Sequence, residues 1–121
     1  MLTQAKENTR VDECNQWYET LVSYRKKLTD FKTDLYAFSP GDKDSDGLKG
    51  IDHFHNQFHI QLVNVHDLKH ELKQHRLMVG LPEGSFSPAA HVEMKKEVDF
   101  LTGYLDKLES EYQNFKRVHS Q

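Results

Sequence analysis

The stretch Ile51–His75, IDHFHNQFHIQLVNVHDLKHELKQH, decides the fold because it carries two neighbouring stripes of side chains along one predicted helix. At about 100° per residue, its large apolar side chains fall in a sector about 120° wide, which is the normal core-facing stripe of an amphipathic helix. That stripe consists of Phe54, Phe58, Leu62, Val65, Leu68 and Leu72. A flanking sector about 60° wide holds His55, His59, His66 and His70, and Ile60 and Val63 lie just beyond these histidines.

The segment before this stretch has the spacing of a heptad seam. Apolar residues alternate at intervals of three and four from Cys14 onward, and Ser39-Pro40-Gly41 ends the pattern. The seam residues are Cys14, Trp17, Leu21, Tyr24, Leu28, Phe31, Leu35 and Phe38. This alternation predicts a first helix over residues 10–38, and the central stretch predicts a second helix over residues 49–78.

A third helix is predicted over residues 88–119, where Ser87 has the properties of an N-cap and Pro88 occupies the first helical position. Its seam is His91, Met94, Val98, Leu101, Leu105, Leu108, Tyr112 and Phe115. No segment alternates like a strand, so we expect an all-α fold. The prediction is a single domain, residues 1–121, folded as an antiparallel up-down-up three-helix bundle. With Trp17 in the first helix, this outline is similar to that of spectrin-type three-helix repeats, a resemblance of architecture alone.

Composition narrows the classes of partner. Charged residues make up 29% of the chain, but the formal net charge is only −3, and no basic stripe is present to bind a phosphate backbone. We therefore expect no nucleic-acid partner. The single cysteine, Cys14, forms no internal disulfide and fits a reducing compartment, and no apolar run approaches the length of a membrane span. These features favour a cytoplasmic protein without a membrane segment.

The histidine stripe suggests a metal site. His55/His59 and His66/His70 are two i,i+4 pairs, a spacing that places two imidazoles on one helix face within reach of one zinc-type ion. Two such pairs from a symmetric dimer would complete four-coordinate sites. The alternative is that these histidines occupy boundary positions, where the ring packs and its tip stays in water.

A second candidate ion site lies between the first two predicted helices. Asp42, Asp44 and Asp46, followed by Gly47, match the opening D-x-D-x-D-G of a calcium loop. Position twelve, however, is His53 instead of the bidentate glutamate that such loops use. The alternative is an acidic turn that places negative charge near the N-terminus of the following helix.

No residue set supports catalysis, because Cys14 occupies a core seam position and no serine lies in a strand–turn–helix elbow. We therefore expect no enzyme. Between Ile51 and Val65 the only charged residue is Asp52, and a charge-poor surface tends to mark a protein contact. The sequence predicts an interaction or scaffold protein, a homodimer or a complex with another protein. Its interface would consist of His55, His59, Ile60, Val63, His66 and His70, and zinc binding by the four histidines is the alternative.

Overall fold

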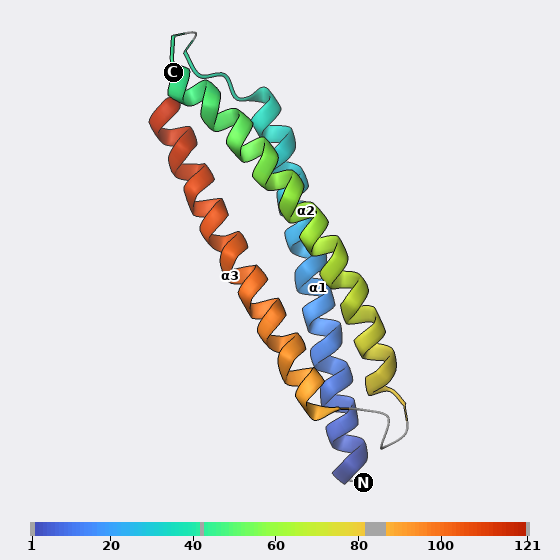
Figure 1. The fold of residues 1–121 in the computed structure, drawn as a ribbon. Helices are drawn as coiled ribbons and strands as arrows, with labels where there is room; N and C mark the ends of the chain where they lie inside the picture. Colours follow the sequence, from blue (N-terminus) through green and yellow to red (C-terminus); the bar gives the residue numbers. More distant parts are fainter. Residues whose placement is uncertain (1, 42, 82–86, 121) are drawn as a thin grey trace.

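Three long helices make up the protein: α1 (Leu2–Ala37), α2 (Ser45–Val79) and α3 (Pro88–His119). The computed structural model describes residues 2–41, 43–81 and 87–120, with side chains from residue 9 onward. Helices α1 and α3 run in the same direction, and α2, which lies between them in the sequence, runs in the opposite direction (Figure 1). The predicted all-α, antiparallel up-down-up bundle is confirmed.

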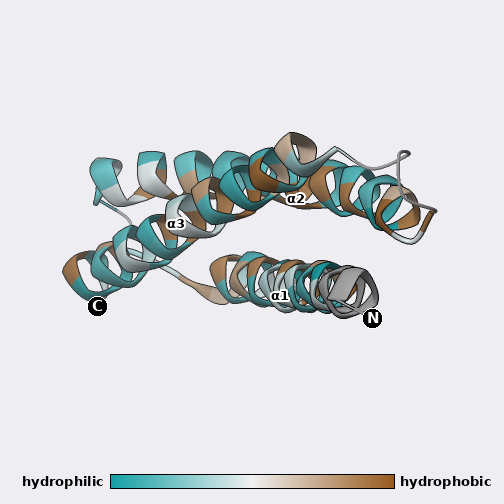
Figure 2. Cartoon of the chain, turned by 90° about the horizontal axis from the view of Figure 1, so that it is seen from below, coloured by the Kyte–Doolittle hydropathy of each residue, from teal (hydrophilic) through white to brown (hydrophobic). Residues whose placement is uncertain are grey.

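The predicted seams form the core. In α1, one position of each heptad is fully buried, and the other carries an aromatic ring that is half-buried at the edge of a helix–helix interface. The buried positions are Cys14, Leu21, Leu28 and Leu35, and the half-buried rings are Trp17, Tyr24, Phe31 and Phe38. Hydrophobic residues recur along all three helices between hydrophilic ones (Figure 2), as expected for helices that each bury one narrow face.

The core differs in chemistry between its two ends. Where the C-terminal half of α1 meets the start of α2 and the end of α3, aromatic rings fill the interior. Phe58 lies edge-on to Tyr112 with ring centroids 4.9 Å apart, and Phe54 contacts both Tyr112 and Phe115. At the opposite end, where α1 and α3 begin and α2 finishes, the buried residues include Cys14, His75 and His91.

Two helices begin earlier than predicted. Helix α1 starts at Leu2 instead of residue 10, because a helix that has nucleated propagates at little cost through polar residues. Helix α2 starts at Ser45 instead of residue 49. The Asp44 side chain accepts a hydrogen bond from the Gly47 backbone N–H at 2.8 Å and so caps the first turn. The predicted cap of α3 is confirmed, since the Ser87 hydroxyl accepts from the Ala90 N–H.

Asp34 on α1 is tied to α3 by two donors to one carboxylate oxygen. The Lys116 ammonium lies 2.7 Å from Oδ2 and the Tyr112 hydroxyl lies 2.6 Å from it. Both hydrogen bonds stabilise the ionised carboxylate, Lys116 most strongly, and they lower the pKa of Asp34 below its ordinary value. These contacts therefore stabilise the fold above the pKa of the unfolded chain, and their contribution disappears as the pH falls through the lower folded-state pKa.

Replacing Asp34 with asparagine is expected to lower the free energy of unfolding at pH 7 by about 0.2–1 kcal/mol, since the side chain is half-exposed and partly screened. Urea unfolding at pH 7 and at about pH 3 measures the difference in the free energy of unfolding between the wild-type protein and the variant. This difference should be smaller at the lower pH. Exposed Asp30 on the same helix provides the control as Asp30→Asn. A loss of equal size at both pH values would contradict the assignment to the ionised carboxylate.

Candidate functional site

Five of the six residues predicted to form an interface lie on the solvent-facing side of α2. Ile60 is 43% exposed and Val63 46% exposed, values that are high for large aliphatic side chains. His59, His66 and His70 are exposed beside them. We call His59, Ile60, Val63, His66 and His70 the outer α2 face. The structure brings the two aliphatic residues and these three histidines onto one side of the helix.

The sixth residue, His55, departs from this arrangement. It is half-buried, and its Nε2 is hydrogen bonded to the Tyr36 hydroxyl of α1 at 2.9 Å. The two rings also meet edge to face, with centroids 5.4 Å apart. His55 is therefore engaged with α1 through Nε2, while His59 faces solvent, so a metal ion shared by this pair would have to bind His55 through Nδ1 or displace Tyr36.

The second predicted histidine pair remains accessible. His66 and His70 line a shallow surface hollow together with Asp67 and Glu71. Within the described ranges, none of the four stripe histidines belongs to a group of three metal-ligating side chains close enough to share an ion. Zinc binding by the stripe stays a prediction, and it would need ligands from a second molecule.

The acidic segment before α2 acts as a helix cap. Asp42 lies outside the described residues, and Asp46 is exposed in the first turn of α2. Both oxygens of Asp44 are engaged: Oδ1 accepts from the Gly47 N–H, and Oδ2 lies 2.6 Å from His119 Nδ1 at the end of α3. These bonds, that from His119 first, lower the pKa of Asp44. Calcium binding by Asp42, Asp44 and Asp46 stays a prediction.

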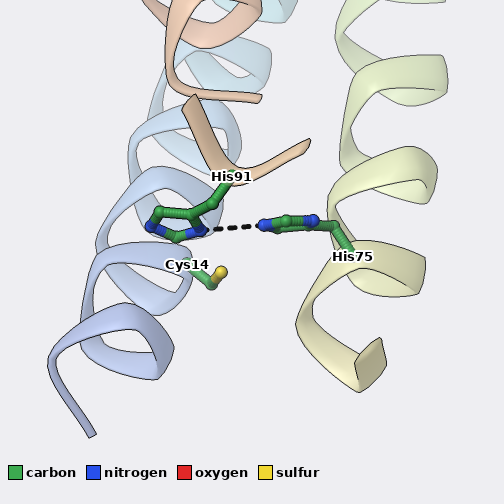
Figure 3. A group of neighbouring side chains, drawn as sticks. All are labelled: Cys14, His75 and His91. Atoms are coloured by element: carbon green, nitrogen blue, oxygen red, sulfur yellow. Dashed lines mark hydrogen bonds between the residues drawn. The ribbon is translucent and has the colours of Figure 1, made fainter. Parts of the chain in front are cut away.

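A different group of ligand-type side chains meets inside the bundle. Cys14 of α1, His75 of α2 and His91 of α3 each place one ligand atom within 4.8 Å of the other two (Figure 3). His75 Nε2 and His91 Nδ1 are hydrogen bonded at 2.8 Å, and the two rings lie edge to edge with centroids 5.1 Å apart and planes inclined by 25°. We call these three residues the Cys–His cluster.

Burial sets the protonation of the Cys–His cluster. Desolvation is the main cause that raises the pKa of Cys14 to about 11; the Glu13 carboxylate adds to the shift and Arg76 partly offsets it. Desolvation, followed by the neighbouring His91, lowers the pKa of His75. At neutral pH Cys14 is therefore a thiol and His75 a neutral imidazole.

The surroundings of His91 fix the orientation of its ring. Its Nδ1 faces His75, and its Nε2 lies 3.5 Å from a carboxylate oxygen of Glu13. The Trp17 ring packs against it with centroids 4.9 Å apart. Glu13 and Trp17, both on α1, thus contact the His91 imidazole and orient it so that Nδ1 points at His75.

Sequence reasoning placed Cys14 and His91 on the core seams but did not bring them together. The topology of the predicted bundle was the feature that could have shown their proximity. In an up-down-up bundle the start of α1, the end of α2 and the start of α3 share one end, so residues 14, 75 and 91 lie at a similar level along the bundle.

Comparisons of the chain with protein families, with characterised proteins and with solved structures gave no significant match. Over the part of the chain that is described, each helix is too polar to cross a membrane.

Proposed function

We propose that this protein is a non-enzymatic helical bundle that associates with a second copy of itself through the outer α2 face. The exposure of Ile60 and Val63 carries the proposal, because two large aliphatic side chains are nearly half exposed on a strip with few charges. Asp52 is the only charged residue between Ile51 and Val65. An exposed apolar strip of this kind is typical of protein contacts.

A second copy suits this strip better than a charged partner. In a twofold dimer the same surface meets itself, so any charge on it would face a like charge across the axis. The outer α2 face contains aliphatic side chains and imidazoles instead, and neutral imidazoles create no such repulsion. Asp52 precedes the outer α2 face on the same helix, and Asp67 lies beside His66 and His70, where all three line one shallow hollow.

The size of the contact predicts its strength. Helix α2 has 35 residues, which corresponds to a length of about 52 Å. The outer α2 face covers only residues 59–70 of this helix, about 18 Å of its length. With a width of about 10 Å it would bury roughly 180 Å² on each copy, or about 360 Å² in total, which is smaller than a standard specific interface. We therefore expect a dimer whose population changes with concentration.

Sedimentation equilibrium across the micromolar range tests the proposal. The wild-type protein should shift from monomer towards dimer with concentration, and the double variant Ile60→Glu/Val63→Glu should stay monomeric, because four glutamates would face one another across the axis. Val22→Glu on α1 is the matched control, since Val22 is 42% exposed and lies on another helix. A wild-type protein that stays monomeric, or a double variant that still dimerises, would refute the proposal.

A further inference from the structure

We propose that Cys14, His75 and His91 together bind one thiophilic d¹⁰ metal ion, Zn²⁺ or Cu⁺, which links all three helices at one end of the bundle. The three side chains come from α1, α2 and α3, and all three are buried (Figure 3). The inference is independent of self-association, because the Cys–His cluster lies in the interior and the outer α2 face lies on the surface.

The donor set and spacing fit such an ion. Zn–S and Zn–N bonds are about 2.3 and 2.0–2.1 Å long, so ligand atoms around a tetrahedral ion lie about 3.3–3.6 Å apart. The ligand atoms of the Cys–His cluster lie within 4.8 Å of one another, and the two facing ring nitrogens are 2.8 Å apart. Shifts of about 1 Å, which small side-chain rotations provide, bring all three to bonding distance.

Glu13 supplies the kind of support that metal-bound histidines usually have. A histidine that binds a metal through one ring nitrogen commonly directs the other to a carboxylate, which fixes its tautomer and orientation. His91 Nδ1 faces the cluster and its Nε2 lies 3.5 Å from Glu13 Oε1. The negative charge of this carboxylate lies on the Nε2 side of the ring, where it favours the tautomer that carries the proton on Nε2 and presents the Nδ1 lone pair to the ion.

Metal binding here involves proton release and no change of oxidation state. The Cys14 S–H bond breaks, a sulfur–metal bond forms, and the proton passes to solvent. The proton of the hydrogen bond between His75 Nε2 and His91 Nδ1 moves to the other nitrogen of the same ring, so both facing nitrogens present lone pairs to the ion. The charge of the ion then compensates the buried thiolate.

Only the folded chain assembles these three ligands, since residues 14, 75 and 91 are far apart in sequence. Binding therefore adds to folding stability by mass action. At an ion concentration 100 times the Kd, we expect the Tm to rise by about 8–15 °C. Both ions accept thiolate and imidazole ligands, so the measurement has to distinguish them.

The test uses the full-length protein without a histidine tag, stripped with chelator and dialysed. Calorimetric titration with Zn²⁺, and anaerobic titration with Cu⁺ against a chromogenic competitor, should give one ion per chain for at least one of the two, with the predicted rise in Tm. The ion with the higher affinity is the one for which the Cys–His cluster is selective. No binding of either ion at micromolar concentration would overturn the proposal.

Substitution with cobalt tests, without any mutation, whether Cys14 binds the ion. Co²⁺ bound in place of zinc by a thiolate gives a sulfur-to-cobalt charge-transfer absorption, and Cys14 is the only cysteine in the chain. The appearance of this band supports the assignment even if variants of the cluster fail to fold. Stoichiometric cobalt binding without the band would overturn it.

Variants then separate the Cys–His cluster from the histidine stripe. Cys14→Ser, His75→Gln and His91→Gln should each abolish the metal-induced rise in Tm, whatever their Tm without metal. The double variant His66→Gln/His70→Gln is the control and should retain one ion per chain and the full rise, since both residues are exposed on α2. Loss of binding in this control, with retention in the cluster variants, would place the ion on the stripe and refute the proposal.

Discussion

Replacing Phe58 with alanine is expected to lower the free energy of unfolding by about 3–5 kcal/mol. The Phe58 side chain is 0% exposed and lies at the centre of the aromatic end of the core. Its ring meets Tyr112 edge-on at 4.9 Å and packs against Phe31 and Phe54 at 5.8 and 5.9 Å. Alanine removes this buried surface and leaves a cavity lined by rings from three helices, which cannot all move inward to fill it.

Guanidinium unfolding followed by circular dichroism measures the effect on Phe58→Ala. Phe100→Ala on α3 is the matched control, because Phe100 is 79% exposed and the chemical change is identical. We expect the control to differ from wild type by no more than about 0.5 kcal/mol. Equal losses in the two variants would show that the aromatic end does not form the stabilising centre of the core.

The opposite end of the bundle contributes less apolar packing. Two imidazoles and a thiol occupy interior positions there, whereas phenyl rings occupy the corresponding positions at the aromatic end. Buried polar groups contribute to stability only when their hydrogen bonds or charges are satisfied. The proposed ion would compensate for this difference, since it would convert the three polar side chains into a cross-link between the helices.

The fold was predictable because it depends on periodicity within each helix. All fourteen core positions named for Ile51–His75 and for the α3 seam are buried or half-buried, as the spacing indicated, and Leu62 and Leu101 are the two that are half-buried. What periodicity could not supply was the burial of Gln61, which lies within the apolar sector of α2 and is bonded to Asn64. A polar residue with a local partner is compatible with a core position, and the sequence shows only its polarity.

The Cys–His cluster was not predictable in the same way. The stripe histidines can be recognised in the sequence because i,i+4 spacing is a local property of one helix. Cys14, His75 and His91 meet only because three helices are aligned along their lengths, and this alignment depends on where each helix begins and on how the connections turn. The start of α2 at Ser45 depends on the Asp44 cap, whereas the sequence placed Asp44 in a candidate calcium loop or an acidic turn.

Replacing Gly50 with alanine is expected to lower the free energy of unfolding by about 1–3 kcal/mol, although alanine favours helix by about 1 kcal/mol. Helix α2 passes so close to α3 at this residue that an added Cβ would lie 2.8 Å from Phe115 Cζ and closer still to the ring edge. Three neighbouring rings restrict the movement of the Phe115 ring. It is buried and packs against Phe38, Phe54 and His119 with centroids 5.5, 5.1 and 4.9 Å away.

Gly103→Ala isolates this packing effect from helix propensity. Gly103 lies inside α3, and a Cβ there meets no heavy atom within 4 Å among those of the described chain, so we expect this variant to be more stable by about 0.5–1 kcal/mol. Thermal and urea unfolding of both variants should therefore give changes of opposite sign. Because both substitutions are glycine to alanine within a helix, the propensity gain is common to them, and the difference between them measures the close approach of α2 to the Phe115 ring. Stabilisation by both would mean that the ring yields and that this contact does not constrain the spacing of the two helices.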